Sequence, residues 1–205
     1  MRSLIFAAGF AASVAALPAL AQAPAGGPQG TPMNVRGTIT KLSGQTLTLK
    51  GRDGVAVNIM LAQDVAVRSY VRKKLSDIHD GDYIASTSMK GKDGKLHAIE
   101  VHFIPAAAPE LQTPWDLRKD SVMTNAHVSG MAKVSGGTDV MLTYKGNATD
   151  IVIDPKTVIV GPGQATMADL KPGKAVFIFR ATKGADGMVT ASNVSVEKNG
   201  VKPPM

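Results

Sequence analysis

Histidine and carboxylate side chains are the residues of this chain that could hold a metal ion. Four histidines occur, at positions 79, 97, 102 and 127, and there is no cysteine. His97 and His102 lie in a predicted strand over residues 96–103, where alternation places them on opposite faces. Glu100 and His102 share a face about 7 Å apart by the rise of a strand, but two ligands without a third make a weak site. We therefore expect no metal site and no bound cofactor.

Other residue types with reactive or metal-binding chemistry are arranged without a recognisable motif. The ten methionines are scattered, with no Met-x-Met or Met-x-x-Met cluster of the kind that suits Cu(I). Gly161-Pro162-Gly163 lacks the lysine and the strand-to-helix context of a phosphate-binding loop. No nucleophile–base pattern occurs, so we expect a protein that is not an enzyme.

Trp115 and Asp116 are the most distinctive pair of neighbouring residues, since Trp115 is the only tryptophan. They stand in a segment with prolines at 105, 109 and 114, which predicts irregular backbone there. One interpretation is a ligand platform. The other, which we favour, is a plug: Trp115 is largely buried between two domains, and Asp116 caps the following turn.

A basic run supplies the remaining candidate ligand contacts. It comprises Arg68, Arg72, Lys73 and Lys74, and a loop lysine, Lys92, follows it. These residues could form a face for an anionic ligand, or a solvated charged edge that blocks strand pairing. Few aromatic residues accompany them, and base stacking needs several. We therefore expect no nucleic-acid partner.

An internal repeat predicts the elements that position these residues. Residues 90–103 read KGKDGKLHAIEVHF and residues 183–196 read KGADGMVTASNVSV, with six of fourteen positions identical. Period-two patterns and Asp-Gly turns predict five strands in each half, with a short helical turn before the fourth. Val35-Arg36-Gly37 aligns with Val128-Ser129-Gly130, and the offset is 92 or 93 residues throughout.

This order of elements is typical of an OB-like barrel. The predicted fold is therefore all-β, a tandem duplication of a small five-stranded OB-like barrel. Gly37, Gly81, Gly130 and Gly173 should lie at bends or close backbone approaches. The expected boundaries are a signal peptide at 1–21, a flexible leader at 22–33, barrel repeats at 34–104 and 127–198, a linker at 105–126 and a tail at 199–205.

The repeated motifs resemble a bacterial exported two-repeat β-barrel family of unknown function. The residues that carry the resemblance are Val128, Gly130, Asp169, Leu170, Gly173, Val176, Asp186, Gly187, Ala191 and Val194. It implies a fold and an exported location, and it implies no catalytic residues. Some members are labelled as metal ABC transporter permeases. That label conflicts with this chain, which has no apolar run after its N-terminal segment long enough to span a bilayer.

The N-terminus predicts where the protein acts. Arg2, a 13-residue apolar run and Ala19-Leu20-Ala21 form a Sec-type signal peptide, with cleavage expected after Ala21. The expected location is the periplasm or the medium. The expected function is a non-enzymatic binding or scaffold protein. The alternatives are a metal-handling accessory protein of the envelope and a weak binder of anionic envelope polymers, which the net charge of +7 favours. The expected partners are another envelope protein or an anionic polymer.

Overall fold

The computed structural model describes residues 30–204, and the predicted signal peptide, residues 1–21, lies outside this range. Within this range the chain forms twelve strands and two single-turn 3-10 helices, so the all-β class is confirmed. No helix among these residues is long and apolar enough to cross a membrane.

The two halves of the chain contain similar elements in the same order. The first half has β1 (Thr31–Ser43), β2 (Thr46–Gly51), β3 (Ala56–Arg72), the 3-10 helix η1 (Leu75–Asp77), β4 (Tyr83–Lys90) and β5 (Leu96–Phe103). The second half has β7 (Ser121–Val134), β8 (Gly137–Tyr144), β9 (Asn147–Ile153), β10 (Val158–Gln164), the 3-10 helix η2 (Met167–Asp169), β11 (Ala175–Lys183) and β12 (Val189–Val196). Between them lies β6 (Leu111–Trp115).

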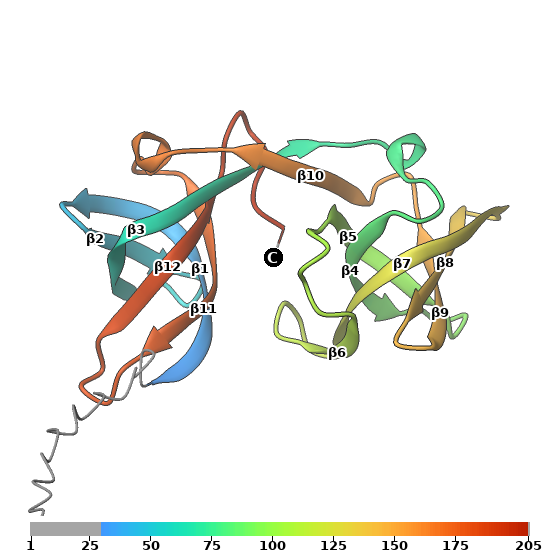
Figure 1. Cartoon of the computed structure of the whole chain (residues 1–205), viewed down its shortest axis with the longest axis horizontal. Coiled ribbons are helices and arrows are strands. Elements are labelled where there is room, and N and C mark those ends of the chain that lie inside the picture. The colour runs from blue at the N-terminus through green and yellow to red at the C-terminus, as the bar shows by residue number, and fades with distance from the viewer. Residues whose placement is uncertain (1–29, 205) are drawn as a thin grey trace, which may run out of the picture.

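These strands close into two five-stranded rings (Figure 1). The first barrel has the order β1-β2-β3-β12-β11, with β3 parallel to β12 and β11 antiparallel to β1. The second barrel has the order β7-β8-β9-β5-β4, with β9 parallel to β5 and β4 antiparallel to β7. Closure removes the exposed edges that a five-stranded sheet would otherwise present.

Each barrel is built from both halves of the chain, which differs from the expected boundaries. Those boundaries assigned one barrel to residues 34–104 and the other to 127–198. Instead β3 continues for 17 residues and leaves the first barrel, so that β4 and β5 complete the second barrel. β10 returns in the opposite direction, and β11 and β12 complete the first barrel. The two halves therefore exchange their last two strands.

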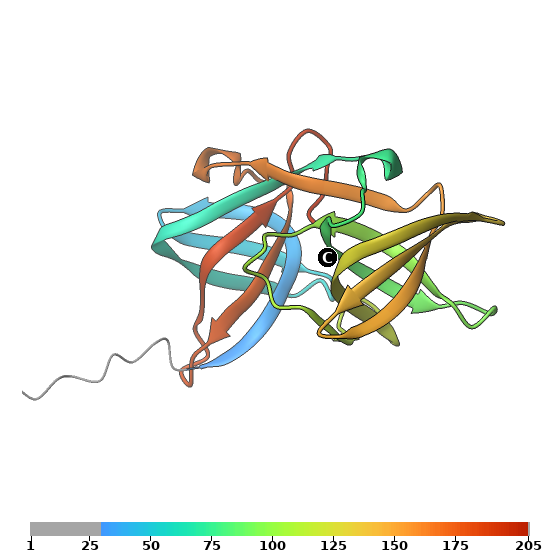
Figure 2. The same cartoon turned by 45° about the vertical axis from the view of Figure 1, so that its right-hand side comes forward.

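β3 and β10 pair side by side as they pass between the barrels, and we call this two-stranded ladder the bridge (Figure 2). Its antiparallel register pairs Arg68 with Gln164, Tyr70 with Pro162 and Arg72 with Val160. Val160 and Gln164 lie 92 residues beyond Arg68 and Arg72. Exchanging the halves therefore maps this ladder onto itself, so a pseudo-two-fold axis passes between Tyr70 and Pro162.

The same pseudo-symmetry relates the other ladders. The alignment of β1 with β7 that the sequence predicted, with Gly37 equivalent to Gly130, was wrong. Gly37 pairs with Val176, and the equivalent ladder pairs Ala126 with Ile84. The counterpart of Gly37 is therefore Ala126, at an offset of 89 residues, and not Gly130. A longer β7–β8 hairpin restores the offset to 93 residues in the following strand, where Leu49 corresponds to Leu142.

The corrected register predicts that alanine substitution has different effects on stability at Gly37 and at Gly130, which the sequence alignment treated as equivalent. A Cβ on Gly37 would lie 2.5 Å from the carbonyl oxygen of Lys50, whereas a Cβ on Gly130 would meet only Met141 atoms at 3.4 Å. We expect Gly37→Ala to lower the free energy of unfolding by about 1–3 kcal/mol, the range for overpacking. Gly130→Ala should change it by less than about 1 kcal/mol. Urea unfolding of both variants measures this, and equal losses would contradict the corrected register.

Gly81 and Gly173 lie in turns with φ of +87° and +85°, which confirms their predicted positions at bends. The leader and linker boundaries need correction. β1 begins at Thr31, inside the expected leader, and the expected linker contains β6 and the start of β7. Proline is compatible with β6 because β6 pairs only with β7, as an edge strand.

Two separate hydrophobic cores fill the barrels. The buried residues of the first are Val35, Ile39, Leu47, Leu49, Ile59, Leu61, Leu170, Val176, Ile178, Ala181, Val189, Ala191, Val194 and Val196. Those of the second are Ile78, Ile84, Ala98, Val101, Ala126, Val128, Val140, Leu142, Ile151, Ile153 and Ile159. The inward-facing side chains are therefore used for packing, and the outward-facing ones are available for binding.

Candidate binding surface between the barrels

An aromatic cluster lies on the outer face of the first barrel, where β6 approaches it. We use this name for Trp115, Phe177 and Phe179 with the guanidinium of Arg36. The rings of Trp115 and Phe179 are 6.2 Å apart, and those of Phe177 and Phe179 are 6.4 Å apart. The Arg36 guanidinium lies 4.6 Å from the Phe177 ring centre and 5.7 Å from that of Trp115. The cluster thus joins β1 and β11 of the first barrel to the segment between the halves.

A β-bulge in β11 exposes Phe179. The β1–β11 register shifts between Met33 and Val35, and Arg180 adopts the left-handed conformation with φ of 54°. This conformation is costly for a residue with a Cβ. Two asparagines hold the bulge: the Arg180 amide donates to Asn34 Oδ1 at 3.2 Å, and Asn193 Nδ2 donates to the Phe179 carbonyl at 3.1 Å. Phe179 is left 46% exposed beside Trp115.

Arg36 and Asp116 form the polar anchor of the cluster. The two terminal guanidinium nitrogens of Arg36 donate to the Asp116 carboxylate, at 2.7 and 2.8 Å, and Asn34 Nδ2 donates to it at 3.2 Å. The Arg36 side chain is only 7% exposed, whereas that of Asp116 is 50% exposed. The hydrogen bonds from Arg36 lower the pKa of Asp116. A bidentate pair of this kind fixes both orientation and charge.

Trp115 lies where the plug interpretation predicts, against Arg36 of the first half and Phe179 of the second half. Its backbone belongs to β6, which pairs with β7 of the second barrel, and its ring approaches Phe179 of the first barrel. Most of its surface is buried, as expected, although it is not completely enclosed. Asp116 was expected to cap the following turn. Its carboxylate instead binds Arg36 of the first barrel, and the Ser121 hydroxyl donates to the carbonyls of Trp115 and Arg118 in that turn.

The predicted basic run does not form one surface. Arg68 and Arg72 share one side of β3 with Tyr70, because strand residues alternate, whereas Lys73 points to the other side. On that side the Lys73 side chain covers Gly161, and its ammonium group lies 6.0 Å from the centre of the Phe103 ring. Lys74 precedes η1, and its amide donates to the Asp77 carboxylate. Lys92 lies in the β4–β5 hairpin turn, at the end of that hairpin away from the bridge.

A cavity of about 360 Å³ lies between the barrels, below the bridge, and we call it the central cavity. Its walls come from β3, β5, β10, the Leu117-Arg118 segment and the C-terminal residues 200–204. Arg72 is the only predicted site residue that lines it. Glu100, 8% exposed, also lines it and accepts a hydrogen bond from Thr87 at 3.1 Å.

The histidines are dispersed, but the argument from alternation was incorrect. Ala98 and Val101 both belong to the second core, and the β4–β5 register shifts opposite Ile99, so a bulge interrupts the alternation. His97 contacts Asp93 at 3.0 Å near the hairpin turn, far from His102 at the other end of β5. Among residues 30–204 no group of three or more histidine or acidic side chains could hold a metal ion.

His102 is the histidine with a buried ring nitrogen. Its Nδ1 is inaccessible to solvent and has no hydrogen-bond partner within the described range, and its ring meets the edge of Tyr70 at 6.3 Å. Burial lowers the pKa of His102 to about 4. The imidazole is therefore neutral at pH 7.

The sequence analysis missed Arg36, Phe177, Phe179 and Arg118. Aromatic residues in a predicted strand are usually assigned to the core. Only the alternation in β11, with Val176 facing inward and Phe177 facing outward, indicates that Phe177 and Phe179 lie on the outer face. No family model, curated protein or solved structure is significantly similar to this chain. The family resemblance stated above therefore remains a prediction.

Proposed function

We propose that this chain is an exported, non-enzymatic binding protein that holds saccharide rings on the aromatic cluster. The observation that carries the proposal is the exposure of Phe179 beside Trp115. A strained bulge, fixed by two asparagine side chains, keeps an apolar ring in solvent there. Backbone strain and exposed aromatic residues both concentrate at functional sites.

The chemistry around the rings suits a sugar. The C–H faces of a pyranose stack on aromatic rings, and its hydroxyls need acceptors and donors at the rim. Asp116 and Asn34 provide these groups, and both are held in place by hydrogen bonds. OB-type barrels bind oligosaccharides in other proteins. The basic net charge favours acidic sugars over neutral ones.

The single tryptophan gives a direct test. We expect an oligomer of uronic acid to change the fluorescence of Trp115 saturably, and a neutral glucan of equal length to bind more weakly. Phe179→Ala should weaken binding by up to about tenfold, because one stacked ring contributes about 0.5–1.5 kcal/mol.

Met188→Ala is the matched control, since Met188 is 53% exposed and lies in the β11–β12 hairpin. It should leave the binding curve unchanged. If neither oligomer gives a saturable change, or if both variants bind equally, saccharide binding by the cluster is refuted.

A further inference from the structure

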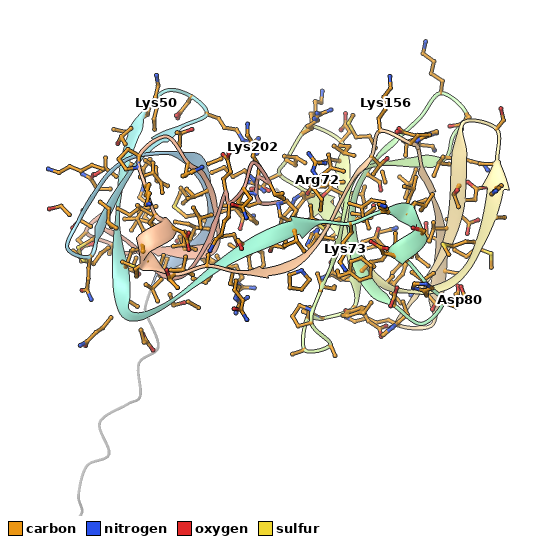
Figure 3. All side chains as sticks on the ribbon, turned by 90° about the horizontal axis from the view of Figure 1, so that it is seen from above. Lys50, Arg72, Lys73, Asp80, Lys156 and Lys202 are labelled. Atoms are coloured by element: carbon orange, nitrogen blue, oxygen red, sulfur yellow. The ribbon has the colours of Figure 1, made fainter. Side chains whose placement is uncertain are left out.

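The central cavity carries an excess of positive charge. Arg72, Arg118 and Lys202 line it, and Glu100 is the only acidic residue among its lining residues in the described range. Within residues 30–204 no carboxylate lies within ion-pair distance of Arg72, Arg118 or Lys202. Figure 3 shows Arg72 and Lys202 in the region between the barrels.

A further cationic side chain lies close by. Burial, followed by the charge of Arg36, lowers the pKa of Arg52, and Asp116, Arg118 and Glu100 are also among its electrostatic neighbours. Arg52 donates to the Leu117 carbonyl at 3.1 Å, which places it beside the cavity wall. The carboxylates of Glu100 and Asp116 offset part of this charge. The cationic side chains outnumber them, so the local charge is positive and an added anion would be stabilised.

The rest of the wall is apolar. It consists of Ile99, Leu117, Val158, Val201, Pro203 and Pro204. The two prolines are buried, so the C-terminal segment forms a fixed wall of the cavity. Its volume is within the range of small-molecule sites, which are mostly apolar with a few placed polar groups.

We propose that the central cavity binds a small organic anion, a carboxylate with a short apolar body. The guanidinium groups of Arg72 and Arg118 take the carboxylate, because planar forks match its geometry. The apolar wall takes the hydrocarbon. This site shares no residue with the aromatic cluster and does not depend on the saccharide proposal.

Calorimetric titration of the full mature chain with three six-carbon probes tests the inference. Hexanoate should bind saturably, whereas hexanol and hexylammonium should bind at least about tenfold more weakly, because a charge-assisted hydrogen bond contributes about 1.5–3 kcal/mol. Arg72→Gln and Arg118→Gln should each weaken hexanoate binding by about tenfold. Lys92→Gln, which removes an exposed charge at the far hairpin, should have no effect.

Two further results separate the two sites. Phe179→Ala should leave hexanoate binding unchanged, and Arg72→Gln should leave the response of Trp115 to saccharide unchanged. The inference is overturned if hexanoate does not bind, if hexanol binds as tightly, or if Arg72→Gln binds hexanoate like the unmodified chain. Circular dichroism of each variant checks that the barrels are formed.

Discussion

Residues 30–104 produced alone are expected to be largely unfolded, and to fold when mixed with residues 105–205. The first piece contains three strands of one barrel and two of the other, and the second piece contains the complement. Co-refolding should give a 1:1 complex with the β-sheet spectrum and the cooperative unfolding of the whole chain. Size-exclusion chromatography with light scattering, and circular dichroism before and after mixing, measure this.

The expected effect is large because both cores would be opened. The first core loses, among others, Val176, Ile178, Val194 and Val196 when residues 105–205 are absent. Each buried side chain of this size contributes about 1.5–3 kcal/mol, and a whole domain is stable by only about 5–15 kcal/mol. The loss of one such set is therefore enough to unfold the first barrel.

Self-association should not rescue the first piece. A homodimer that copied the β3–β10 bridge would place Arg68 opposite Arg72 of the second copy, at both ends of the ladder. Like charges directly opposite one another on antiparallel strands are destabilising. In the whole chain, Gln164 and Val160 occupy those opposing positions. A monomeric, cooperatively folded product from residues 30–104 alone would show that the exchange of strands is not required.

The chain is expected to lose about 2–3 kcal/mol of stability between pH 7 and pH 4 because of His102. The unfolded chain takes up a proton near pH 6.5, whereas burial lowers the pKa of His102 in the folded chain to about 4. The unfolded state therefore binds more protons across this window, so stability falls as the pH falls and levels off below about 4. The size of this loss in stability follows from about 1.4 kcal/mol for each unit by which the pKa of His102 differs between the folded and unfolded chains.

Urea unfolding at several pH values, on the unmodified chain and on His102→Gln, measures this contribution. The variant should lose the part of the pH dependence above pH 4. His79→Gln is the matched control, since the His79 side chain is 72% exposed. The lowered pKa of Asp116 acts in the same direction, but only near and below the ordinary pKa of an aspartate. If His102→Gln and the unmodified chain have the same pH dependence, His102 does not control it.

Local chemistry explains which parts of the fold could be predicted from the sequence. Asp-Gly turns at Gly54, Gly94 and Gly187 have positive φ as expected. Asp77 and Asp169 each accept the backbone N–H that precedes a 3-10 turn. The exchange of strands could not be predicted, because β5 and β12, the last strands of the two halves, present similar patterns to β3 and β9. Only the continuation of β3 past the first barrel, as far as Arg72, decides between them, and no local pattern encodes it.

The candidate site was predicted only in part, for a similar reason. Trp115 was conspicuous because it is unique, but its partners Arg36 and Phe179 lie 79 and 64 residues away. The bulge at Arg180 carries no proline or glycine that would mark it. Arg72 was found through its charge, but its neighbour in the cavity, Arg118, comes from the segment between the halves. Long-range pairing, which the sequence does not reveal residue by residue, creates both surfaces.

The exchange of strands also sets an order for folding during synthesis. All strands of the second barrel have been made once β9 ends at Ile153, whereas the first barrel lacks β11 and β12 until Val196. β1 to β3 must therefore wait as a nascent, unclosed sheet while the second barrel forms. The pairing of Thr31 with Lys183, which ties one of the earliest residues to one of the latest, closes a very long loop. Contacts so distant in sequence make folding slow, and the waiting sheet is the state most exposed to aggregation and to chaperones.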